Sequence, residues 1–356
     1  MFIPVSQSVT ARLDGLRELF QDCQDTLFLR GSFARGDSYC NDIDISAYNK
    51  TGVIELTNPP TEYNGLKINY GGISLENFEA YFSVCPRAGS SMMEMQPIVL
   101  GHSEVAVTYA DQLKQYFKNR TPNYLLFLLV EEETNGRIAD RSCGDDYFTL
   151  KRQRGGKRTV SRIIWGTKAR HFDSFYSLSH SEVLEKMVAH GALPWNVAKS
   201  CTFILNNSHQ LQHKDKLKAH SAQIVRWYYD YYYPVVKSYL LDYLPSDVVV
   251  YSIKAARSDT KVADLYHAYE LSKSLDGQLK WILLFALSGN WKLPPSLLVE
   301  IWHEFRNNTA HRNIIRNLIA NVSTPRDLIN PAEFIDNKLM WRAYTIRLRL
   351  LKEFQA

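Results

Sequence analysis

Two aspartates separated by one residue, Asp42 and Asp44, are the side chains of this 356-residue chain best placed to do chemistry. They belong to Asp42-Ile43-Asp44-Ile45, whose alternation predicts a strand with both carboxylates on one face, about 6–7 Å apart. Two such carboxylates repel each other unless a cation lies between them. The pair therefore predicts a Mg²⁺ site, because Mg²⁺ takes one or two carboxylates and completes its shell with water and phosphate oxygens.

A glycine–serine pair precedes the aspartates and could bind phosphate. The apolar residues 27–29 predict a short buried strand that ends at Gly31 and Ser32, and Arg35 adds a cation to the turn that follows. Glycine lets backbone N–H groups approach an anion closely, above all if a helix begins there. Either motif alone is typical of a solvated loop or strand end. The two together predict a site for a nucleoside triphosphate with a divalent metal.

This stretch resembles the signature of the DNA polymerase β-type nucleotidyltransferase superfamily, a glycine–serine loop followed by aspartate-x-aspartate. The resemblance implies that Gly31, Ser32 and Arg35 bind the triphosphate and that Asp42 and Asp44 hold two Mg²⁺ ions. It also implies in-line attack of an acceptor on the α-phosphate and release of pyrophosphate.

The superfamily usually carries a third carboxylate on its third strand. Residues 65–74 alternate like that strand, yet they offer Lys67 and Asn69 and no acid. Glu94, on a predicted helix, is the nearest alternative for the general base and catalytic carboxylate. A solvated helix residue is the other interpretation of Glu94.

The most basic window of the chain is residues 151–158, which contain Gly155 and Gly156. A run of charge is usually a solvated loop. Here the two glycines would expose backbone N–H groups, and a predicted helix at 159–171 begins beside them, so the window could bind phosphate through Lys151 and Arg158.

This window is similar to the helical region behind the catalytic domain of the bacterial uridylyltransferases that modify the PII protein. The positions that keep that family's pattern are Leu150, Lys151, Gly155, Gly156, Arg158, Trp165, Ser177, Leu178, Gly191 and Leu193. Arg154 replaces a glycine of the pattern, and Thr159 replaces an aspartate. The likeness covers about residues 27–217 with gaps, and it favours UTP as the donor over ATP.

Periodicity divides the chain into two predicted domains. Residues 1–118 are expected to form an α/β (α+β) polymerase β-like catalytic domain with a small mixed sheet, with helices at 8–20 and 75–82. Residues 119–356 are expected to form an all-α bundle, with a further division near 218 left open. Helices are predicted at 111–117 and 122–140. The aromatic run at 227–233 predicts core packing in the bundle, with a platform for stacking bases or a hydrophobic acceptor pocket as the alternatives.

Composition narrows the class of protein. The net charge of +5 permits an anionic ligand but is too small to favour nucleic acid as a partner. Five scattered cysteines without Cys-x-x-Cys spacing predict neither a zinc site nor a disulfide framework. No signal peptide or membrane-spanning stretch is recognisable, which predicts a cytoplasmic protein without a membrane partner.

These observations predict a Mg²⁺-dependent nucleotidyltransferase. It would move UMP or AMP from UTP or ATP to a hydroxyl or similar acceptor on a small molecule or a protein. Because the third strand lacks an acid, a nucleotide-binding pseudoenzyme that acts as a sensor or scaffold is the alternative.

Overall fold

The computed structural model describes residues 3–4, 9–34, 39–40, 42–51, 53–55, 58–74, 86–94, 96–98, 103–141, 147–307 and 311–355. The chain forms two compact units, each built from several segments. The first contains Met1–Phe82, Arg87–Thr121 and Val160–Ile224, and the second contains Ser83–Pro86, Pro122–Thr159 and Val225–Ala356. Arg35 and the predicted helix at 75–82 lie outside the described residues.

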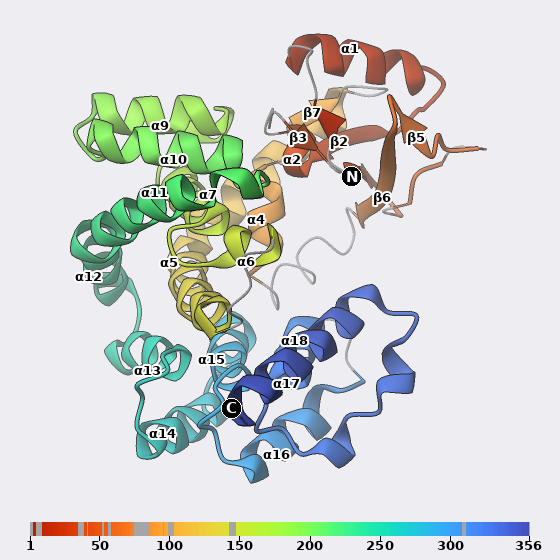
Figure 1. Ribbon diagram of the computed structural model, residues 1–356. Helices are drawn as coiled ribbons and strands as arrows, with labels where there is room; N and C mark the ends of the chain where they lie inside the picture. Colours follow the sequence, from red (N-terminus) through yellow and green to blue (C-terminus); the bar gives the residue numbers. More distant parts are fainter. Residues whose placement is uncertain are drawn as a thin grey trace. The chain divides into compact units, whose positions relative to one another are not determined.

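A small mixed sheet organises the first unit (Figure 1, red to orange). Its strand order is β5 (Glu62–Tyr63), β6 (Leu66–Ser74), β4 (Asp42–Asn49), β2 (Thr26–Arg30) and β7 (Gln96–Ile98). β4 and β6 are parallel, whereas β2 is antiparallel to both of its neighbours. A separate two-stranded sheet pairs β1 (Ile3–Pro4) with β3 (Tyr39–Cys40). The predicted small mixed sheet is therefore present, as are the strands predicted at 42–45 and 65–74.

The core of this unit lies between the sheet and α1 (Val9–Leu19), which confirms the helix predicted at 8–20. Leu16 and Phe20 from the helix side pack with Leu27, Ile43 and Ile45 from the central strands, and all five are at most 1% exposed. Because Ile43 and Ile45 point into this core, the alternation of β4 turns Asp42 and Asp44 to the opposite face.

Besides α1, the first unit contains several further helices. They include the first part of α5 (Ser103–Arg141), most of α7 (Lys157–Arg170) and the first part of α11 (Lys214–Trp227). The others are α2 (Gly31–Ala34), α4 (Ala88–Met92), α8 (Phe172–Phe175), α9 (His180–Ala189), α10 (Trp195–Asn207) and η1 (Leu211–His213). The predicted domain boundary at 118 falls inside α5, close to the point between Thr121 and Pro122 where the two units divide that helix.

The second unit is helical. It contains α6 (Tyr147–Arg152), the π-helical segment η2 (Tyr228–Tyr232), α12 (Tyr233–Tyr243), α13 (Ser246–Ala256), α14 (Val262–Lys273), α15 (Gly277–Ser288), α16 (Pro295–Phe305), α17 (Arg312–Ala320), η4 (Arg326–Leu328), η5 (Pro331–Phe334) and α18 (Lys338–Gln355). The apolar helix α15 packs against α13, α14 and α17 and forms the centre of this unit (Figure 1, blue). Trp227 and Tyr228 are buried, so core packing is confirmed for this part of the aromatic run.

The helices predicted at 111–117 and 122–140 are one continuous helix, α5, which runs through Pro122. Proline removes one helical hydrogen bond and usually ends or bends a helix. Here the residues that follow, 124–130, are all buried, and their packing outweighs the local preference. No helix in the described part of the chain is long and apolar enough to cross a bilayer.

Candidate active site

The two aspartates of β4 converge on one side chain of the neighbouring strand. β4 and β6 pair in a register that sets Asp44 beside Asn69. The Asn69 amide donates hydrogen bonds to Oδ2 of Asp42 at 2.8 Å and to Oδ1 of Asp44 at 3.3 Å. The two carboxylates therefore lie on the same face of the sheet, as predicted. Asn69 lies on β6, the strand on which the superfamily usually carries its third acid.

Negative charge is in excess around Asp44, as the pKa of its carboxyl group indicates. The pKa of Asp44 is raised above its usual value, chiefly by burial and then by repulsion from Asp42. Glu94 adds to the increase, whereas Arg30 and the hydrogen bond from Asn69 oppose it. A divalent cation held by Asp42 and Asp44 would reverse the repulsion, so these residues fit the predicted metal.

The Gly31 turn lies directly against the Asp44 carboxylate. Gly31 has φ +77°, and a Cβ built on it would lie 2.6 Å from Oδ2 of Asp44. Only glycine allows both this left-handed backbone and this approach. Ser32 is half-buried and follows Gly31 in α2, so the predicted phosphate-binding pair and the metal-binding pair are brought together.

A Gly31→Ala change should therefore damage both stability and ligand binding. We expect the free energy of unfolding to fall by about 1–2 kcal/mol, because an L-residue pays this for the left-handed backbone, and we expect Asp44 to be displaced. Gly191→Ala is the matched control, since Gly191 has φ +69° and no atom within 4 Å of an added Cβ. Denaturant unfolding and triphosphate titration of both variants check this, and equal binding by the two would contradict it.

Glu94 lies in the turn after α4 rather than on a helix. Its charge adds to the raised pKa of Asp44 and partly opposes the lowering of the pKa of Lys168 by burial, so Glu94 lies in the same electrostatic neighbourhood. Among the described residues, no three His, Cys, Asp or Glu side chains form a group that could hold a metal. A metal bound at this face would therefore be held by Asp42 and Asp44 and by oxygens from water and substrate. A catalytic role for Glu94 stays a prediction.

Lys168 fixes the turn that carries Glu94. Its ammonium group donates to the carbonyl oxygens of Met93 and Tyr176, each at 3.1 Å, and the residue is only 4% exposed. Burial lowers the pKa of Lys168 to about 8. The sequence does not point to Lys168, because the contact joins residues 75 positions apart.

The lowered pKa of Lys168 predicts a pH dependence of stability. Above about pH 8 folded Lys168 loses its proton, whereas the unfolded chain keeps it to about pH 10. The unfolded state then binds more protons, so the free energy of unfolding should rise with pH in this range. Lys168→Met should lack this rise. Thermal unfolding of both proteins at several pH values checks this, and parallel profiles would contradict it.

The predicted basic window belongs to the second unit, where its glycines have structural roles. Gly155 has φ +72°, and its N–H donates to Oγ1 of Thr159 at 2.9 Å. The Gly156 N–H donates to the Gln153 carbonyl at 2.9 Å. Both N–H groups are thus used within the fold, contrary to the expectation that they face an anion. The predicted phosphate contacts of Lys151 and Arg158 stay predictions.

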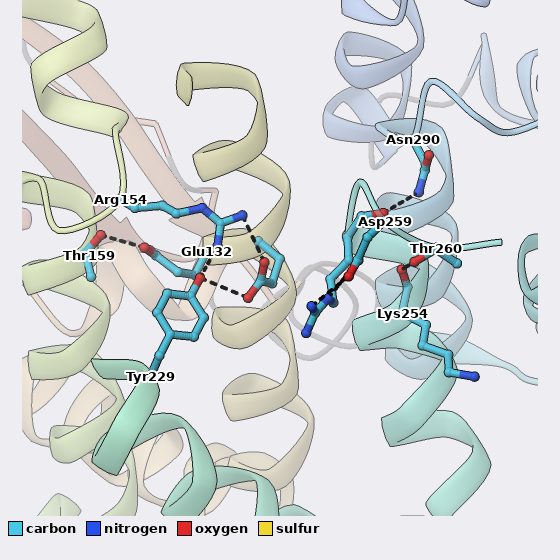
Figure 2. A network of polar contacts seen from close by, with 10 residues as sticks. Glu132, Arg154, Thr159, Tyr229, Lys254, Asp259, Thr260 and Asn290 are labelled. Carbon is cyan, nitrogen blue, oxygen red and sulfur yellow. Dashed lines mark hydrogen bonds and ion pairs between the residues drawn. The ribbon is translucent and has the colours of Figure 1, made fainter. Parts of the chain in front are cut away.

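Two of the positions that depart from the uridylyltransferase pattern, Arg154 and Thr159, contact adjacent carboxylates of α5 (Figure 2). Thr159 donates to Oε1 of Glu132 at 2.6 Å. Arg154 pairs with Glu133 at 3.1 Å, and the Tyr229 hydroxyl donates to the same carboxylate at 2.9 Å. Glu132 and Glu133 are at most 3% exposed, so these partners compensate charge in the interior of the unit.

Comparisons with protein-family models, with curated proteins and with solved structures found no match to this chain. The assignment to the nucleotidyltransferase superfamily therefore stays a prediction, supported by the motif residues and by their geometry.

Proposed function

We propose that this protein is a Mg²⁺-dependent nucleotidyltransferase that moves UMP or AMP from UTP or ATP to a hydroxyl or similar acceptor. The observation that supports this most strongly is the convergence of Asp42 and Asp44 on Asn69, with the Gly31 turn against Asp44. The turn would bind the phosphates of a triphosphate, and the two carboxylates would bind the metal ion of the same triphosphate.

The proposed roles of the residues follow from their places. Asp42 and Asp44 would hold the metal, and the Gly31–Ser32 turn would bind the phosphates beyond the α-phosphate. Bound Mg²⁺ would neutralise charge on the phosphates as the transfer proceeds. The acceptor oxygen forms a bond to the α-phosphorus while the bond to the bridging oxygen breaks, and pyrophosphate leaves with that electron pair. Glu94 is the proposed acceptor of the hydroxyl proton.

One observation favours the second candidate, a nucleotide-binding pseudoenzyme. Asn69 lies beside Asp44 on the strand where the superfamily carries its third acid, and an amide cannot accept a proton as a carboxylate does. Such a protein would still bind a triphosphate through the turn and the aspartates. It would not transfer the nucleotide.

Transfer of label distinguishes the two candidates. The protein would be incubated with each of the four ribonucleoside triphosphates, labelled at the α-phosphate, with Mg²⁺ and a cell extract as the source of acceptor. We expect Mg²⁺-dependent pyrophosphate release and label on an acceptor, both lost in Asp42→Asn. A triphosphate that binds without any pyrophosphate release would refute the transferase and support the pseudoenzyme.

A further inference from the structure

The second unit contains a pocket that the proposed transferase chemistry does not use. It lies between α12, α13 and the loop that joins α13 to α14, and its volume is about 330 Å³. This is at the lower end of the range for small-ligand sites. Tyr233, Val250 and Ile253 supply its apolar wall. No residue of the first unit lines it.

Positive charge dominates the rest of the lining. Four cationic side chains line the pocket, Lys237, Lys254, Arg257 and Lys261, against two acidic ones, Asp259 and Asp264. Both acids are already paired, because Asp259 contacts Arg257 at 2.9 Å and Asp264 contacts Lys254 at 3.1 Å. Lys237 and Lys261 have no ion pair with any described residue. The lining thus has two cations more than it has anions.

The loop between α13 and α14, which carries Arg257, Asp259 and Lys261, is held by hydrogen bonds within the second unit. The Asn290 amide, which is fully buried, donates to the carbonyl oxygens of Ala255 at 2.8 Å and Arg257 at 3.0 Å (Figure 2). The Thr260 hydroxyl donates to the Lys254 carbonyl. The carbonyl groups of Lys254, Ala255 and Arg257 are therefore satisfied by neutral side chains rather than by Lys237 or Lys261. A pocket held in this way loses little entropy on binding.

The cationic side chains and the apolar wall identify the class of ligand. We propose that this pocket binds a small phosphomonoester, with its phosphate held by Lys237 and Lys261 and its uncharged body against Tyr233, Val250 and Ile253. An inorganic anion alone would leave the apolar wall unused, and an uncharged molecule would leave the excess positive charge of the lining unmatched. The site is independent of the metal and of Asp42 and Asp44.

Calorimetric titration of the full chain in EDTA tests this site. The probes are phenyl phosphate, inorganic phosphate and phenol. We expect phenyl phosphate to bind more tightly than inorganic phosphate and phenol not to bind. Lys237→Gln and Lys261→Gln should each weaken phenyl phosphate about tenfold, the typical loss of one charge-assisted hydrogen bond. Lys338→Gln is the control, because Lys338 is exposed in the same unit and does not line the pocket.

Failure of this site is distinguishable from failure of the proposed transferase. Asp42→Asn should leave phenyl phosphate binding unchanged, whereas the double lysine variant should lose it and keep the unfolding temperature of the wild type. The proposal is overturned if the wild type does not bind phenyl phosphate, or if the double variant binds it as the wild type does. Equal affinity for inorganic and phenyl phosphate would overturn the role of the apolar wall.

Discussion

Asp42→Asn should reduce Mg²⁺-dependent triphosphate binding and nucleotide transfer on the order of a hundredfold or more. The change keeps the size of the side chain and leaves an oxygen that can accept the Asn69 hydrogen bond at 2.8 Å. It removes one of the two proposed anionic metal ligands. Titration calorimetry and the label-transfer assay measure the two losses.

The same variant should be at least as stable as the wild type without metal. Repulsion from Asp42 is a cause of the raised pKa of Asp44, so ionised Asp44 destabilises the fold at neutral pH. A carboxyl group that binds its proton more tightly in the folded state than in the unfolded state stabilises the fold at low pH. This contribution to the free energy of unfolding is lost as the pH rises through the folded pKa. Removing the neighbouring charge reduces this cost. An unfolding temperature well below the wild type would contradict the account.

Asp22→Asn is the matched control for Asp42→Asn. Asp22 is an exposed residue in the turn after α1, in the same unit and outside the candidate site. Its replacement should change neither binding nor stability measurably. If Asp22→Asn and Asp42→Asn bind the triphosphate equally well, Asp42 is not a metal ligand.

Arg154→Ala should lower the free energy of unfolding by about 3 kcal/mol, the lower end of the range for breaking a buried ion pair. The lower end applies because the Arg154 side chain is 25% exposed while that of Glu133 is 4% exposed. Without Arg154 the Glu133 carboxylate keeps the Tyr229 hydroxyl but loses its cation. Denaturant unfolding measures the change.

A second substitution separates the charge from the packing of Arg154. Glu133→Gln in the Arg154→Ala background should recover part of the lost stability, because it removes the uncompensated charge. Arg306→Ala is the control, since Arg306 is exposed at the end of α16 and should cost at most about 0.5 kcal/mol. A double variant less stable than Arg154→Ala alone would contradict the role assigned to this pair.

The features that the sequence predicts well are those with a local cause. The alternation of Asp42, Ile43, Asp44 and Ile45 places two side chains in the core and two on the other face, because a strand alternates whatever its partners are. The turn at Gly31 follows from one residue that tolerates a left-handed backbone. That the turn and the carboxylates meet depends on the antiparallel pairing of β2 and β4, which sets Arg30 opposite Asp44.

The features that the sequence does not predict depend on distant partners. Asn69 meets Asp44 only because β4 and β6 pair in parallel in one register, and Lys168 reaches Met93 from a helix far along the chain. Gly155 and Gly156 suggest phosphate binding by pattern, yet their N–H groups bond within the fold. Arg154 and Thr159 depart from the resembled pattern, but this departure does not identify their partners Glu133 and Glu132.

The most direct test of the central claim is calorimetry with the four ribonucleoside triphosphates, first with Mg²⁺ and then with EDTA. We expect one triphosphate, UTP or ATP, to bind tightly with Mg²⁺, and we expect EDTA or Asp42→Asn to abolish this binding. Binding of no triphosphate, or binding that is the same with and without the metal, would contradict the assignment of Asp42 and Asp44 as a metal site.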